Sequence, residues 1–245
     1  SALALSSLSA LATDTIVNCG ATVDVVAGTL TGPRSFTINA GRIQSVDNVA
    51  SKAANVIDLS TYTCLPGLID MHVHLTSQSN PRSYIENFTL NPADYAFRAA
   101  HYADITLQAG FTSVRNLGDD GTVTRALRGA IAQGIASGPR IFTAGKSLAT
   151  TGGHADPTNG HRFDLMGDPH AKSGVVNGIA EARKAVRQRY KEGADLIKIT
   201  ATGGVLSTAK SGQNPQFMDD ELAAIIATAK DYGFKVAAHA HGTEG

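Results

Sequence analysis

Residues 68–75 read LIDMHVHL, and they form the first of five strand-like segments, four of which precede a helix-like segment. Side chains alternate along a strand with period two, so His72 and His74 share one face with Asp70. The alternate residues, which we expect to pack against helices, are Ile69, Met71, Val73 and Leu75. Two imidazoles that project from the same face at the end of one strand can bind a divalent metal ion. Two separately hydrogen-bonded core histidines are the alternative.

The same alternation continues to the end of the chain. Further strands are expected at 112–118, 140–148, 196–203 and 235–242, with helices at 93–110, 123–134, 179–192 and 219–232. Repeated strand–helix units predict a parallel sheet with right-handed crossovers. A doubly wound sheet and a (β/α)8 TIM barrel both fit this pattern. No G-x-G-x-x-G follows the first strand, and the unusual polar residues lie toward the strands' carboxyl ends, which favours the barrel.

Only strands 1–5 of such a barrel are present. Each unit takes roughly 35 residues, so closure needs about another 100, and we expect the chain to be a fragment or part of a longer polypeptide. The barrel part occupies 66–245. Residues 15–65 alternate in short apolar and polar segments with turns between them, which predicts a small all-β unit.

Residues 1–14 are interpreted as a tail or a signal-peptide remnant, because a Leu/Ala stretch ends in Ala10-Leu11-Ala12 without a basic start. A remnant would place the protein in the periplasm or outside the cell; a simple tail leaves it cytoplasmic. In the first case Cys19 and Cys64 could form a bridge, but the sequence does not fix that pairing.

Composition excludes several classes of protein. The 21 basic and 21 acidic residues cancel, which argues against a nucleic-acid binder. Two cysteines exclude a disulfide-rich scaffold and a four-cysteine zinc site. No apolar run approaches the ~20 residues of a membrane span.

Lys198 lies within the predicted strand ADLIKITATG, on one face with Leu196 and Thr200. Lysine is almost never fully buried without a partner. Desolvation would lower its pKa and free the neutral amine, which can take up carbon dioxide and become a carbamate able to bridge two metals. A salt-bridged interior lysine is the alternative.

His239 and His241 repeat the two-residue spacing on the fifth strand, and one or both are expected near His72 and His74. His154 follows two glycines just after the third strand, where the backbone can turn sharply toward a ligand. It is a candidate for binding a substrate carboxylate or carbonyl. The alternative for His239 and His241 is that only one of them is functional. The alternative for His154 is a histidine in a surface loop without a functional role.

Together these segments resemble the amidohydrolase superfamily, and within it the imidazolonepropionase-like subgroup. That subgroup includes zinc-dependent Xaa-Pro and Xaa-Arg dipeptidases and enzymes that hydrolyse ochratoxin A. The matching segments are LPGLIDMHVHL (65–75), GFTSVRNLG (110–118), GPRIFTAGKSLATTGGHAD (138–156), ADLIKITATGG (194–204) and FKVAAHAHGTEG (234–245).

The resemblance implies a barrel with a flanking β-sandwich built from both chain ends, of which 15–65 would be the N-terminal part. It implies two Zn2+ ions bridged by carboxylated Lys198, which makes this lysine the catalytic residue of the chain. His72 and His74 would hold the more buried ion and His239 the second. His154 would contact the substrate, and His241 is a further substrate-binding candidate.

We therefore expect a binuclear-metal hydrolase acting on the amide bond of an N-acyl amino acid or dipeptide-like small molecule, with ochratoxin A among the candidates. Cyclic amide hydrolysis and an inactive metal-binding fragment are the alternatives. The family also needs a histidine from strand six and an aspartate from strand eight, so residues 1–245 alone are predicted to be catalytically incomplete. A homo-oligomer is expected, with the remaining barrel strands supplied by further C-terminal sequence.

Overall fold

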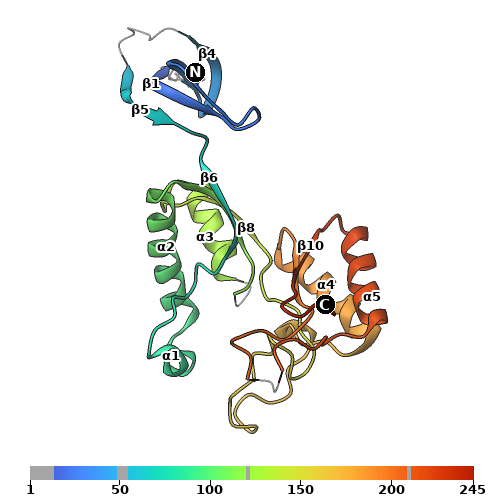
Figure 1. Ribbon diagram of the computed structural model, residues 1–245. Coiled ribbons are helices and arrows are strands. Elements are labelled where there is room, and N and C mark those ends of the chain that lie inside the picture. Colours follow the sequence, from blue (N-terminus) through green and yellow to red (C-terminus); the bar gives the residue numbers. More distant parts are fainter. Residues whose placement is uncertain (1–13, 49–54, 120–121, 209–210) are drawn as a thin grey trace, which may run out of the picture. The chain divides into compact units, whose positions relative to one another are not determined.

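The computed structural model describes residues 14–48, 55–119, 122–208 and 211–245 (Figure 1). Two compact units divide the chain, Ser1–Gly67 and Leu68–Gly245, and each is described by itself. The expected tail falls, except for Asp14, outside the described residues. No helix within the described ranges combines the length and the hydropathy needed to cross a membrane.

The first unit contains the strands expected from its alternating pattern. They are β1 (Thr15–Asp24), β2 (Thr29–Thr31), β3 (Arg34–Asn39), β4 (Arg42–Asp47) and β5 (Val56–Cys64). One sheet has the order β2-β1-β3-β4 with antiparallel pairs, and β5 pairs with β1 in parallel. These described strands form a single sheet, so the two-layer sandwich stays a prediction.

A disulfide joins Cys19 of β1 to Cys64 at the end of β5, across 45 residues of sequence. The crosslink reduces the conformational entropy of the unfolded chain. For a loop of this length the resulting stabilisation of the folded unit is roughly 2–4 kcal/mol. We expect Cys19→Ser combined with Cys64→Ser to lower the free energy of unfolding of this unit by that amount, measured by urea denaturation. Reduced wild-type protein is the control and should match the variant. An unchanged urea midpoint in both would contradict the prediction.

The second unit has a mixed α/β fold. Its strands are β6 (Leu68–Val73), β7 (Phe111–Asn116), β8 (Arg140–Thr143), β9 (Ile197–Thr200) and β10 (Val236–His239). Its helices are α1 (Ser83–Thr89), α2 (Pro92–Gln108), α3 (Val123–Ala132), α4 (Gly178–Glu192) and α5 (Asp219–Asp231), with a short 3-10 turn, η1 (Ala171–Ser173). All its strand pairs are parallel, in the orders β6-β7-β8 and β9-β10.

The segment after β8 connects these two groups of strands. Leu148 N–H donates to the Lys198 carbonyl at 2.8 Å, and Thr200 N–H donates to the Leu148 carbonyl at 3.0 Å. These two bonds form a parallel bridge between Leu148 and Ile199, and the Asp195 N–H donates to the Thr143 carbonyl at the end of β8 at 2.8 Å. The parallel pattern therefore continues from β8 to β9, and the sheet curls. Closure into an eight-stranded barrel stays a prediction.

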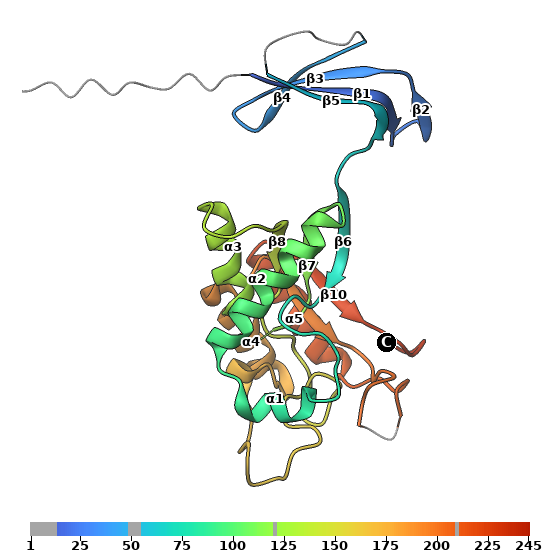
Figure 2. The same ribbon diagram turned by 90° about the vertical axis from the view of Figure 1, so that its left-hand side faces the viewer.

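Two apolar clusters hold helices against the strands. Helices α2 and α3 cover β7 and β8, with Val114, Leu127 and Ile141 buried between them (Figure 2). Helices α4 and α5 cover β9 through a second cluster that includes Val186 and Ile225.

Two expectations about the strands need correction, and one helix is additional to those expected. The strand expected at 140–148 ends at Thr143, because Gly145 adopts a left-handed φ of +61° that breaks the extended backbone. Helix α1 was not expected from the sequence. Val73 and Leu75 pack against α2 and α3 as predicted, but Ile69 and Met71 are exposed because the α2–α3 cluster does not extend over them.

Candidate metal centre

His72 and His74 converge as the period-two spacing predicts. Their Nε2 atoms lie 3.3 Å apart. Two nitrogens held at about 2.1 Å by one tetrahedral ion would lie about 3.4 Å apart. The His74 Nδ1 atom is 3.0 Å from the Gly118 carbonyl oxygen, which only accepts, so Nδ1 carries the proton and Nε2 keeps its lone pair. The pair therefore fits one divalent metal ion.

Lys198 lies in the middle of β9 and is 4% exposed. Burial lowers the pKa of its ammonium, and the nearby Arg115 guanidinium lowers it further. Arg115 is fixed there by a 2.7 Å bond from its Nε to the Met71 carbonyl. None of the ion pairs among the described residues includes Lys198. A salt-bridged interior lysine, the alternative drawn from the sequence, is absent from this part of the chain.

His239, at the end of β10, is near enough to His72 for its charge to lower the pKa of that ring. Its Nε2 lies 2.9 Å from the Gly203 carbonyl, so Nε2 carries the proton and Nδ1 keeps its lone pair. The His154 ring stacks on it with centroids 4.4 Å apart and planes inclined by 18°. A Cβ built on Gly204 would lie only 2.7 Å from His239 Nε2 and 2.9 Å from His154 Cε1, so only glycine leaves room for both rings.

Burial and neighbouring positive charges lower the pKa values of two of these histidines. Burial lowers the pKa of His72, and the positive charges of Lys198, His74, Arg115 and His239 lower it further. Burial likewise lowers the pKa of His154, followed by the charges of His239 and Lys198. Both imidazoles are therefore held toward their neutral form, which is the form that binds metals.

His241 does not follow the alternation that placed it beside His239. Strand β10 ends at His239, and the His241 backbone N–H donates to Thr202 Oγ1 at 2.9 Å. Its side chain is exposed. The strand ends before His241, whose backbone turns toward Thr202. The two-residue alternation of side chains therefore does not apply to His241.

The side chains present decide whether this site can bind metal ions. In the described ranges, no three side chains among His, Cys, Asp and Glu are grouped to hold a metal ion. His72 and His74 lie together, and the charges of Lys198 and His239 are near enough to lower the pKa of His72. An ammonium group is no ligand, so the site becomes suitable for a metal pair only if Lys198 is converted to an anionic oxygen donor.

Residues 63–245 match the model of the amidohydrolase family. The chain belongs to this family. Ochratoxinase of Aspergillus niger is 31% identical over 194 residues, which is 74% of this chain and 40% of that protein. Among solved structures, a Xaa-Pro dipeptidase with bound methionine is 47% identical with a TM-score of 0.88, over 95% of this chain and 58% of the other.

A prolidase complexed with N-methylphosphonate-L-proline is 35% identical, with a TM-score of 0.81, over 93% of this chain and 56% of its own. The A. niger ochratoxinase structure is 26% identical, with a TM-score of 0.78, over 95% of this chain and 56% of that chain. The amidohydrolase chain described here thus spans less than two thirds of each of these relatives.

Sequence reasoning did not find Ser207, which lies in the segment after β9. Its Oγ is 2.6 Å from His154 Nδ1 and accepts from the Gly204 N–H at 2.9 Å. The His154 backbone N–H is held separately by Gln216 Oε1 at 2.8 Å. Ser207 and His154 are 53 residues apart in sequence, and no motif links them. Ser207 therefore fixes the orientation of the His154 ring.

We expect Ser207→Ala to raise KM roughly 5- to 10-fold, the effect of one hydrogen bond, with a smaller change in kcat. Steady-state kinetics of the full-length amidohydrolase would measure both. Ser207→Thr keeps the hydroxyl and is expected to stay within about two-fold of wild type. An unaltered KM in Ser207→Ala would show that the ring needs no such support.

Proposed function

We propose that the protein is a binuclear-metal hydrolase that cleaves the amide bond of N-acyl amino acids or dipeptides. The observation that carries this proposal is the pair of His72 and His74 Nε2 atoms 3.3 Å apart, beside the buried Lys198. In this proposal His72 and His74 would hold one Zn2+, His239 would hold the second, and carboxylated Lys198 would be shared by both. The choice of an amide bond is supported by two relatives, which are named ochratoxinase and Xaa-Pro dipeptidase.

The surroundings of Lys198 support the proposed carboxylation. Because burial lowers the pKa of the ammonium, a neutral amine is accessible. Its nitrogen forms a bond to the carbon of carbon dioxide and releases one proton. The negative charge then lies on two oxygens, and two oxygens allow one residue to reach two cations.

The bound metal pair would lower the pKa of a water molecule and polarise the scissile carbonyl. This chain's residues hold the geometry. The Gly118 carbonyl orients His74, the Gly203 carbonyl orients His239, and Ser207 orients His154. His154 would receive the carboxylate or carbonyl of the substrate. The proton acceptor expected from the family resemblance is an aspartate of strand eight, which lies beyond the five strands present here.

Amino-acid ligands in two relatives support the choice of substrate. The Xaa-Pro dipeptidase binds methionine in its active site, and the prolidase binds N-methylphosphonate-L-proline. Both ligands are amino acids or derivatives of one. We infer the same class of leaving group for this chain.

The test uses the full-length protein, stripped of metal by a chelator and then reconstituted with Zn2+ in bicarbonate buffer. We expect hydrolysis of N-acyl amino acids, Xaa-Pro dipeptides or ochratoxin A to disappear on stripping and to return with metal. Lactams serve as the comparison substrates. Full turnover after complete metal removal, or turnover of lactams alone, would refute the proposal.

The architecture is part of the same proposal. We infer that residues 66–245 are the first five units of a closed (β/α)8 barrel, and that 15–65 contribute to a flanking sandwich in a homo-oligomer. Native mass spectrometry of the natural protein reports polypeptide mass, bound metals and copies together. A polypeptide of the relatives' length carrying two zinc ions is the expected result. A metal-free polypeptide of 25.4 kDa would contradict it.

A further inference from the structure

A cavity of about 710 Å3 lies in the second unit, between segments that follow the carboxyl ends of β6, β7 and β8. The residues of its lining that matter here are Tyr84, Glu86, Gly118, Asp119, Lys146 and His161. In parallel barrels the carboxyl ends of the strands carry the chemistry. The cavity is therefore on the same face as the candidate metal centre.

Two connections link the cavity to that centre. Gly118 lines the cavity, and its carbonyl oxygen is 3.0 Å from His74 Nδ1. His161 lies in the same loop as His154, and this loop is internally braced. The Asp156 carboxylate accepts from the backbone N–H groups of Gly152 and Thr158 at 2.8 and 2.9 Å. A short, rigid stretch therefore places one histidine at the centre and another in the cavity.

His161 forms an aromatic wall with residues of α1. Its ring stacks on Tyr84, with centroids 5.7 Å apart and planes inclined by 23°, and Phe88 packs edge-on against it at 5.1 Å. The His161 Nδ1 atom is buried and has no hydrogen-bond partner in the described part of the chain, so aromatic packing holds the ring. Tyr84 nevertheless remains 55% exposed and faces a cavity it helps to line.

Helix α1 is fixed before any ligand arrives. Both Arg98 terminal nitrogens, from α2, donate to the Glu86 carboxylate at 2.8 and 3.0 Å. Asn80 Nδ2 donates to the same carboxylate at 3.3 Å. A wall that is already in place loses little entropy when a ligand binds.

We propose that Tyr84 and His161, supported by Phe88, select substrates with a planar aromatic acyl group. This inference rests on the proposed function. The charged side chains that line the cavity are two carboxylates, Glu86 and Asp119, and one ammonium, Lys146. A substrate carboxylate gains little there, so the cavity takes the uncharged acyl part while the amino-acid part lies toward His154. Aromatic rings favour stacked or edge-on partners over aliphatic ones.

The test compares matched ligands on the metal-loaded, full-length protein. N-benzoyl-alanine and N-acetyl-alanine report hydrolysis. N-benzenesulfonyl-alanine and N-methanesulfonyl-alanine, which are not hydrolysed, report binding by calorimetry. We expect wild type to prefer the aromatic member of each pair. Tyr84→Ala should reduce that preference roughly 3- to 10-fold in both kcat/KM and binding.

Phe163→Ala is the matched control, because Phe163 belongs to the same loop as His161 but is fully exposed at 101%. It should keep the preference of wild type. Phe88→Leu, which preserves bulk, provides a second variant that should lose part of the preference even if Tyr84→Ala misfolds. Equal preference in Tyr84→Ala, Phe88→Leu and wild type overturns the pocket assignment. An aromatic binding preference without any amide hydrolysis overturns the proposed function and leaves the pocket intact.

Discussion

Lys198→Ala is expected to lower kcat/KM by roughly 10³-fold or more and to reduce bound zinc below one equivalent per chain. Loss of a single preorganised electrostatic group in an active site already costs about 10²–10³-fold. This variant would also remove the ligand proposed to bridge both ions. Elemental analysis of the purified full-length protein measures the metal, and kinetics on an N-acyl amino acid measure the rate.

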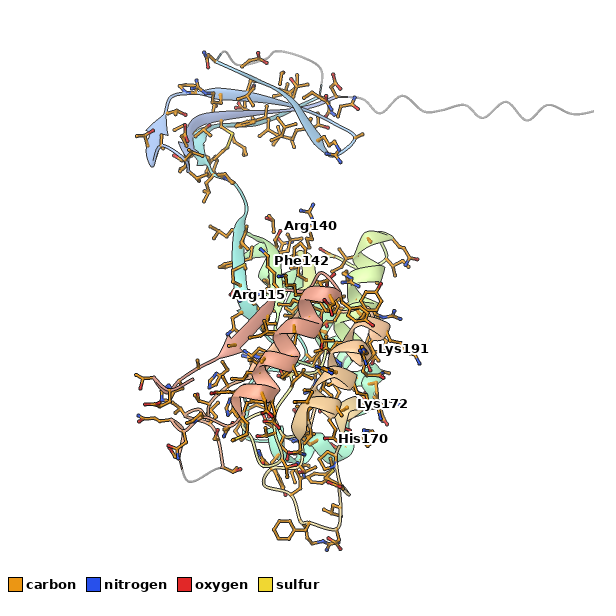
Figure 3. All side chains as sticks on the ribbon, turned by 90° about the vertical axis from the view of Figure 1, so that its right-hand side faces the viewer. Arg115, Arg140, Phe142, His170, Lys172 and Lys191 are labelled. Atoms are coloured by element: carbon orange, nitrogen blue, oxygen red, sulfur yellow. A yellow bond between two sulfur atoms is a disulfide. The ribbon has the colours of Figure 1, made fainter. Side chains whose placement is uncertain are left out.

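Lys191→Ala makes the same substitution at an exposed position on α4 and is the matched control (Figure 3). It should retain full metal content and activity. Growth in 13C-bicarbonate adds a direct readout, because carboxylated lysine gives a carbamate carbon signal that Lys198→Ala should lack. Two zinc ions and wild-type turnover in Lys198→Ala would eliminate the bridging role.

Gly204→Ala is expected to lower kcat/KM by about 10²-fold while changing the free energy of unfolding by less than about 2 kcal/mol. The added methyl group would lie 2.7 Å from His239 Nε2 and 2.9 Å from His154 Cε1, so both rings must move. Gly204 is not among the glycines with positive φ, and so its backbone accepts alanine without strain. The damage should therefore be confined to the two histidines.

Gly129→Ala in α3 is the comparison variant, since its added methyl group meets only the Gln133 side chain at 3.9 Å. Alanine is the better helix former, so this variant should keep its activity and gain slightly in stability. Urea denaturation and steady-state kinetics of both variants separate the two effects. Equal activities would mean that the stacked histidines tolerate displacement.

The strands and the longer helices could be predicted because each has its own periodicity. His72 and His74 converge through the same rule, which needs no knowledge of distant residues. The rule does not extend to His241, because β10 ends at His239 and alternation holds only inside a strand. Helix α1 escaped prediction because it is short, has no buried residue and is held by the Glu86–Arg98 pair.

The residues that orient the candidate centre could not be predicted for a different reason. Gly118, Ser207 and Gly204 act through contacts with residues more than 30 positions away in the sequence. A contact of that kind depends on where loops arrive after folding. Local pattern carries no information about it, whereas the histidines and Lys198 stand out by their chemical type within apolar strands.

The Cys19–Cys64 crosslink has a consequence for how a metal would reach this protein. The chain's only two cysteines form this bond, and both precede His72 in the sequence. Thiolates are the softest zinc ligands that a folding chain offers, and they would compete with imidazoles for the ion. Once oxidised, neither sulfur is available as a thiolate. In an oxidising compartment the bond would therefore remove the two sulfur ligands that could compete with the histidines for a metal ion.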